Sequence, residues 1–190
     1  MNKIYIELKK FEKIDFSKQN LVKAEYENCT FVNCNFANTN LSGINFTECE
    51  FTDCNLSMAK MAKTLLRDLK FTDCKLLGLN FDNCNEFLSS LYFEKCTLNL
   101  SSFFKLKLKK AVFKNCSLHE VDFTETDLSN SIFDNCDLTR TIFKNTILEK
   151  VDFRSSFNYS IDPEINSLKK TKFSKEGVIG LLDKYDIEIE

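Results

Sequence analysis

The sequence has 190 residues, of which 28% are charged, and its formal net charge is −2. This balance excludes the strongly basic composition of many nucleic-acid-binding domains, and no apolar run approaches the roughly 18 residues of a membrane-spanning helix. Nine cysteines without the continuous apolar segment of an export signal predict a reducing, cytoplasmic location.

Residues 1–10 alternate apolar and charged side chains, which predicts a strand-like N-terminal cap. Beyond them, large apolar residues recur at every fifth position, which we call centres, and a compact residue usually lies two positions before each centre. A period of five fits no helix, and a repeat this regular is typical of a solenoid. Residues two apart in a strand share a face, so the next inward residue, three positions later, requires a corner in every unit.

The cysteine spacing predicts how many corners close one coil. Cys34, Cys54 and Cys74 are twenty residues apart, and so are Cys96, Cys116 and Cys136. The gap between Cys74 and Cys96 is twenty-two residues. Four five-residue units therefore form one coil, and residues 11–158 form about seven coils. Two inward columns are predicted, one of cysteines and one of phenylalanines: Cys34, Cys54, Cys74, Cys96, Cys116 and Cys136, and Phe31, Phe51, Phe71, Phe93, Phe113, Phe133 and Phe153.

Two stretches depart from the repeat. The two extra residues are predicted to bulge out at Asn85–Ser90, because an unchanged count would place Glu86 at an inward centre, where an unpaired charge is costly. The stretch Lys60–Leu69 keeps the count but strays from the usual residue types, which predicts an irregular coil.

The repeat units resemble those of the pentapeptide-repeat family, as in C-N-F-A-N (34–38), V-D-F-T-E (121–125) and C-D-L-T-R (136–140). This resemblance implies an all-β solenoid, a right-handed quadrilateral β-helix. Residues 27–51 and 54–59 look like the quinolone-resistance (Qnr-type) branch. Members of that branch bind DNA gyrase and topoisomerase IV, were proposed to mimic duplex DNA, and dimerise through a short C-terminal helix.

The C-terminal segment, residues 159–190, is predicted to cap the last coil. Ser174 is a candidate N-cap for a short helix over 175–185, and the alternation of Ile187 and Ile189 with acids predicts a small strand. The resemblance implies that the apolar stripe of this helix forms a homodimer contact: Val178, Leu181, Leu182 and Tyr185.

Catalytic, metal and cofactor chemistry finds little support in the sequence. The cysteines occupy positions that other units fill with Ala, Ser, Thr or Val, which indicates compact core residues rather than metal ligands or disulfides. His119, the one histidine, adjoins a centre and is predicted to face solvent. Without a phosphate-binding loop or a catalytic triad pattern, we expect neither an enzyme nor a cofactor.

Charge patterning provides the candidate partner-facing surface. Six acids without an intervening base form an acidic strip, predicted to mimic phosphates on a partner: Glu120, Asp122, Glu125, Asp127, Asp134 and Asp137. A lysine-rich patch at residues 105–114 precedes the strip, and ordinary mixed solvated faces are an equal alternative. These lysines lack an aromatic platform, which disfavours direct nucleic-acid binding.

Two functions remain open from the sequence. The first is a non-enzymatic, dimeric binding protein that competes with DNA for a type II topoisomerase and protects it from quinolones. The second is a pentapeptide-repeat scaffold or self-immunity module with another protein partner.

Overall fold

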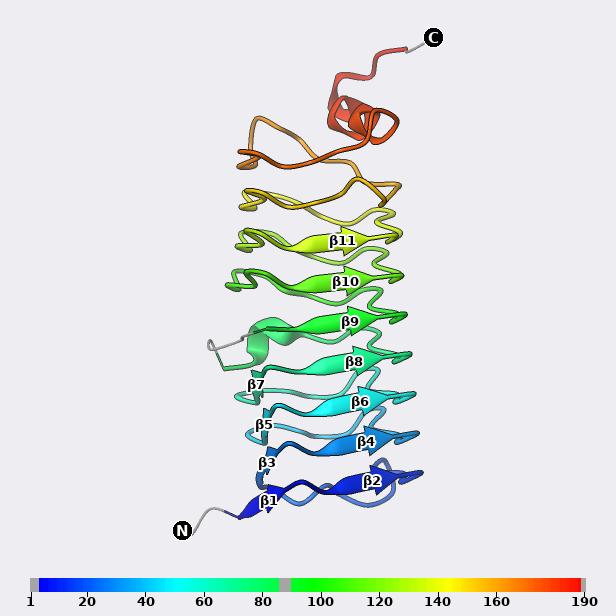
Figure 1. The fold of residues 1–190 in the computed structure, drawn as a ribbon, viewed down its shortest axis with the longest axis vertical. Coiled ribbons are helices and arrows are strands. Elements are labelled where there is room, and N and C mark those ends of the chain that lie inside the picture. The colour runs from blue at the N-terminus through cyan, green and yellow to red at the C-terminus, as the bar shows by residue number, and fades with distance from the viewer. Residues whose placement is uncertain (1–3, 86–89, 189–190) are drawn as a thin grey trace.

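The computed structural model describes residues 4–85 and 90–188, and it is a rod-shaped β-solenoid with the chain ends at opposite ends of the rod (Figure 1). Two parallel sheets cover two sides of the rod. The first contains β1 (Tyr5–Glu7), β3 (Glu25–Glu27), β5 (Asn45–Thr47) and β7 (Leu65–Arg67). The second contains β2 (Lys10–Glu12), β4 (Thr30–Val32), β6 (Glu50–Thr52), β8 (Lys70–Thr72), β9 (Tyr92–Glu94), β10 (Val112–Lys114) and β11 (Ile132–Asp134).

Single-residue β-bridges stack the coils on the other two sides. Bridges such as Asn35 to Asn55 mark what we call the Asn35 side, and bridges such as Asn40 to Lys60 mark the Asn40 side. Most partners on all four sides are twenty residues apart, as in the pairing of Phe31 with Phe51. The predicted four-unit coil is therefore confirmed.

The structure also narrows the position of the two extra residues. Phe71 pairs with Phe93, twenty-two positions later. Asn85 N still donates to Thr64 O, with the same offset of twenty-one as Leu65 N to Ile44 O. The excess therefore lies between Asn85 and Tyr92. The predicted bulge falls largely on residues 86–89, Glu86 included, which lie outside the described residues.

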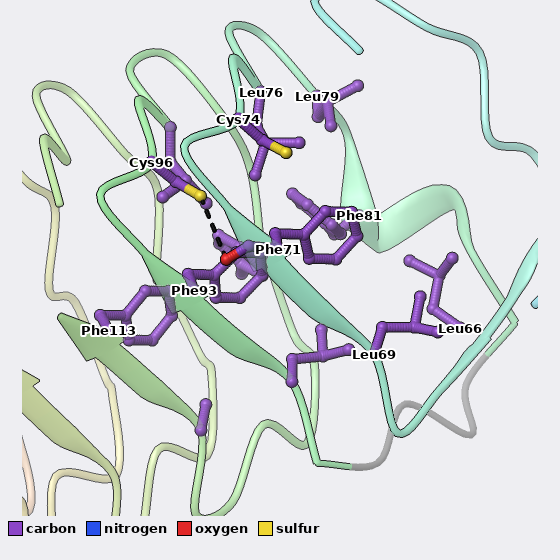
Figure 2. Close-up of a cluster of buried hydrophobic side chains, with 14 of the residues drawn as sticks. Leu66, Leu69, Phe71, Cys74, Leu76, Leu79, Phe81, Phe93, Cys96 and Phe113 are labelled. Atoms are coloured by element: carbon purple, nitrogen blue, oxygen red, sulfur yellow. Dashed lines mark hydrogen bonds between the residues drawn. The ribbon is translucent and has the colours of Figure 1, made fainter. Parts of the chain in front are cut away.

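The interior contains stacked aromatic rings, as the sequence predicts. Successive rings of the column from Phe31 to Phe153 lie 4.7–5.3 Å apart and nearly parallel. A second column begins with Phe81 over Phe103 at 4.4 Å, and its rings meet the first column edge to face, as Phe103 meets Phe113 at 85°. Figure 2 shows Phe71, Phe93 and Phe113 in line. Such packing tolerates little change in volume.

The predicted cysteine column lies beside these rings. Its thiols are buried and donate to main-chain carbonyl oxygens of the preceding coil, as Cys96 Sγ does to Phe71 O at 3.5 Å (Figure 2). All nine cysteines of the chain are buried and free. Burial raises the pKa of Cys49 and of Cys84 to about 12, so both thiols stay protonated at neutral pH.

The corners of the coil are formed mostly by residues other than glycine. In most units one residue has a positive φ, such as Asn33 at 53°, Asp53 at 52° and Lys105 at 60°. This conformation costs about 1–2 kcal/mol for most side chains, although Asn and Asp tolerate it better. The main-chain N–H at each of these corners donates to the next coil, as Asn33 N does to Thr52 O at 2.9 Å.

The prediction of an irregular coil at Lys60–Leu69 is wrong. Strand β7 pairs with β5 in the usual register, and Leu66 occupies a buried centre. Thr64 is fully buried, and its hydroxyl donates to Leu41 O at 2.8 Å. Because this bond satisfies the hydroxyl, threonine replaces cysteine at a compact position without disturbing the coil.

Both ends of the chain differ from a simple cap. Residues 5–7 and 10, expected in the N-terminal cap, already belong to β1 and β2. At the other end the predicted helix consists of two short 3-10 helices, η2 (Gly177–Leu181) and η3 (Asp183–Tyr185). Ser174 Oγ accepts from Gly177 N at 2.9 Å, as expected of an N-cap. Ile187 lies in no strand, and Ile189 is outside the described residues.

Candidate protein-binding surface

The solenoid distributes the predicted acidic strip around the rod instead of along it. Eighteen residues, from Glu120 to Asp137, nearly complete one coil. Asp137 bridges Ser117 on the Asn35 side, and Asp122 bridges Ser102 on the Asn40 side. Asp127 lies on the continuation of the β1–β7 side and Asp134 on the β2–β11 side. The acids of the strip therefore lie on all four sides of the rod and do not form one continuous acidic face.

Most acids of the strip also have partners. Across adjacent coils, Glu125 pairs with Lys105 at 3.5 Å, Asp127 with Lys109 at 3.1 Å and Glu120 with Arg140 at 3.6 Å. Asp134 accepts from Ser155 Oγ at 2.9 Å, and Asp122 Oδ1 accepts from Thr124 N at 2.8 Å. The lysine-rich patch and the acidic strip thus neutralise each other in part, as a mixed solvated surface does.

Asp137 is the most strongly stabilised carboxylate of the strip. Desolvation opposes its ionisation, but hydrogen bonds from Thr139, Asn158 and His119 outweigh it and lower the pKa of Asp137 to about 2. His119 Nε2 lies 2.7 Å from Asp137 Oδ2. The histidine is partly exposed and belongs to this surface pair.

A different acidic region was missed by the sequence reasoning. Between Lys23 and Lys60 the chain contains no lysine or arginine. Nearly two whole coils therefore contain no base of their own, and we call residues 24–59 the base-free belt. Bases of the adjacent coils border it: Lys23 Nζ lies over Gly43, and Lys70 is the register partner of Glu50. The five acids of the belt are Glu25, Glu27, Glu48, Glu50 and Asp53. The absence of bases was visible in the sequence, but it acquires a spatial meaning only once the twenty-residue coil is known.

Four acids, three of the belt and one of the coil next to it, lack partners such as those of the strip among the residues that the structure describes. Glu48, Glu50, Asp53 and Asp73 are exposed, and their carboxylates have no ion-pair or hydrogen-bond partner within residues 4–85 and 90–188. Glu48 and Asp53 lie at the two corners that flank β6, and Asp73 stacks on Asp53 through Asp53 N to Thr72 O. These four exposed carboxylates gather around β6 and β8, where their charge is available to a partner.

The predicted dimer residues do not form one exposed stripe. Val178 and Tyr185 are 43% and 48% exposed, whereas Leu181 packs against the core of the solenoid. Leu182 is half-buried, and Ile179 and Ile187 are also exposed at this end. The helical segment therefore caps the last coil with one face and presents apolar residues on another.

Polar contacts fix the cap to the loop before it. Lys184 Nζ lies 2.7 Å from both Asp162 Oδ1 and Glu164 Oε2, and Tyr185 Oη donates to Glu164. A Cβ at Gly180 would collide with the main-chain oxygen of Tyr159, so this glycine permits the close approach.

A cleft of about 510 Å³ lies between the cap and the last coil, and its lining is mixed in character, with Arg154, Phe157, Tyr159, Glu176 and Asp183 among its residues. The Arg154 guanidinium is already bound by Asp152 at 2.8 Å.

The part of the chain that the structure describes contains no cluster of three or more His, Cys, Asp or Glu side chains arranged to hold a metal ion. Among the same residues, no helix is long and apolar enough to cross a membrane.

Comparisons with known proteins agree with this geometry. QnrB1, a plasmid-mediated fluoroquinolone resistance protein, superposes with a TM-score of 0.63 at 18% identity, covering 96% of this chain and 100% of QnrB1. A trypsin-treated QnrB1 variant gives the same TM-score and identity, with 100% of both chains covered. HetL, a pentapeptide-repeat protein of heterocyst differentiation regulation from the cyanobacterium Nostoc, has a TM-score of 0.46 at 14% identity, covering 92% of this chain and 90% of HetL.

No curated protein matches the sequence. At these identities the structural likeness establishes the fold alone. Two family models match the sequence directly: a pentapeptide repeat region at residues 24–104 and 44–123, and pentapeptide repeats of eight copies at residues 116–154. These matches take in more than half of the chain. The chain belongs to the pentapeptide-repeat family.

Proposed function

We propose that this protein is a non-enzymatic, cytoplasmic binding protein whose exposed carboxylates around β6 and β8 occupy a cationic surface of a protein partner. The observation that carries the proposal is the base-free belt, because four exposed carboxylates there and in the next coil have no partner among the residues that the structure describes. Unpaired acids keep a negative potential that steers a cationic partner toward the rod.

A type II topoisomerase, DNA gyrase or topoisomerase IV, is the first candidate partner. Such enzymes bind duplex DNA on cationic surfaces, which carboxylates can occupy in place of phosphates. The likeness to QnrB1, a fluoroquinolone resistance protein, motivates the choice of partner. Protection from quinolones would follow if the rod displaces the DNA on which these drugs act.

A supercoiling assay with purified DNA gyrase and ciprofloxacin tests this proposal. We expect the wild-type protein to restore supercoiling, and the triple variant Glu48→Gln, Asp53→Asn and Asp73→Asn to lose that effect. The matched control, Glu120→Gln with Glu125→Gln, removes charges that already have basic partners and should retain protection. No binding and no protection by the wild type at any concentration would exclude a gyrase partner.

If DNA gyrase does not bind, the remaining proposal is a scaffold or self-immunity module with another cationic protein.

We further propose a homodimer formed by the exposed apolar residues of the cap, including Val178, Ile179 and Tyr185. Light scattering of Ile179→Asp should then give a monomer where the wild type gives a dimer. A wild-type monomer would contradict the dimer without affecting the partner.

A further inference from the structure

An apolar surface runs along the corner between the Asn35 side and the Asn40 side. Three consecutive coils place Met58, Gly78 and Leu100 at this corner, with φ values of 57°, 64° and 62°. Met58 N donates to Leu77 O, which brings Leu77 beside them. Met58, Leu77 and Leu100 are 56%, 38% and 57% exposed, and we call these three residues the apolar corner.

The fold requires no apolar residues here, although the Met58 thioether lies over Gly78 of the next coil. Other coils place Asn38, Glu120 and Arg140 at the same corner with the same positive φ, so polar side chains are compatible with this conformation. A positive φ favours Asn or Gly over Met and Leu, and exposure to water disfavours large apolar groups. Both effects oppose Met58 and Leu100, which points to a role outside the folding of the rod.

The apolar corner shares a side of the rod with unpaired acids. In one coil the Asn35 side runs from the corner residue Asp53 to the corner residue Met58, and in the next from Asp73 to Gly78. In these two coils a carboxylate lies at one edge of this side and an apolar corner residue or glycine at the other, whereas in the third coil Lys95 takes the edge opposite Leu100. A single base, Lys75, lies between the two edges in these coils.

We propose that this side is the docking surface for a folded protein that presents cationic groups to Asp53 and Asp73 and an apolar pocket to the apolar corner. The inference rests on the proposed function, because its partner is a protein with a cationic surface, and it adds an apolar contact. Duplex DNA offers phosphates along its whole length, so mimicry of phosphates alone leaves the apolar corner unexplained. Apolar anchors in a desolvated pocket commonly dominate the affinity of a protein interface.

The double variant Met58→Asn with Leu100→Asn tests this inference, with purified DNA gyrase as the probe. Asn38 shows that the corner accepts asparagine, at a φ of 58°. We expect an unchanged or higher Tm and binding at least tenfold weaker, at low and at high salt alike. The control Lys63→Asn, at the neighbouring corner with a φ of 58°, removes a base and should not weaken binding.

Two outcomes would overturn the docking surface. Unchanged affinity of the double variant would show that the apolar corner makes no contact. A fall in Tm that accounts for weaker binding would assign these residues to folding instead.

A gyrase that fails to bind even the wild type would refute the proposed partner, and a second experiment then decides on the surface. A photo-crosslinking amino acid at Leu77 is expressed in cells, and the attached protein is identified by mass spectrometry. We expect one protein with a cationic, apolar site, lost when Asp53→Asn and Asp73→Asn are added. No crosslinked protein, or a crosslink to a second copy of this chain alone, would overturn the inference.

Discussion

The coils around β4 and β6 and the coils around β10 and β11 share one scaffold and differ in their surface. Both stack phenylalanines at about 5 Å, as Phe31 on Phe51 and Phe113 on Phe133. Around β10 and β11, acids meet bases on adjacent coils, whereas the base-free belt has no base to offer. In this solenoid, surface charge is decided by what lies about twenty residues away, and a run of acids along the sequence is a poor guide.

The largest expected effect is one that both regions share. Phe51→Ala and Phe113→Ala each remove a ring that is at most 1% exposed and stacked on both faces. Each should lower the free energy of unfolding by about 3–5 kcal/mol, measured by chemical denaturation. A large difference in the free energy of unfolding between the two variants would mean that the two regions do not share one equally stable scaffold.

Low pH should reduce the stability of the coils around β10 and β11 through the protonation of Asp137. Its pKa is lowered to about 2, so its contribution to stability is complete above the unfolded-state pKa of about 3.9 and is lost as the pH falls toward 2. After allowance for solvent screening, we expect Asp137→Asn to cost about 1–2 kcal/mol at neutral pH and little near pH 2. Denaturation curves across this range provide the measurement, and an equal cost at both pH values would contradict this account.

The smallest expected effect concerns the exposed acids themselves. Removing the Glu125 charge with Glu125→Gln breaks its pair with Lys105 and should cost about 0.2–1 kcal/mol, less at high salt. Glu48→Gln removes no pair with any residue in 4–85 or 90–188 and should leave Tm unchanged or slightly raised. Thermal melts at low and high salt compare them, and a loss of stability in Glu48→Gln would reveal a structural role for that carboxylate.

The inward residues made the fold readable from the sequence. The spacing of Cys34, Cys54 and Cys74 gives the length of the coil, because a buried column must repeat with the coil, and the five-residue unit divides that length into four sides. Residue type misled in the stretch Lys60–Leu69, where Met61 and Leu66 fill buried centres in the usual register. The two 3-10 helices of the cap could not be foreseen, because packing against Tyr159, rather than helix propensity, shapes that segment.

The candidate surface was less predictable, because it depends on which outward residues become neighbours. Asp127 and Lys109 are eighteen positions apart and in contact, so an acid that looked free is paired. Asp53 and Met58 are five positions apart and lie at opposite edges of one side. Such relations follow from the coil length, and they become visible only after each residue has been assigned to a side and a corner.

The salt dependence of binding to purified DNA gyrase tests the central claim most directly. The account predicts that affinity falls with ionic strength for the wild type and for Glu120→Gln with Glu125→Gln. The variant Glu48→Gln, Asp53→Asn and Asp73→Asn should bind more weakly and show a clearly shallower slope of log affinity against log salt. Equal slopes for the three proteins would contradict the claim that the unpaired carboxylates around β6 and β8 make the contact.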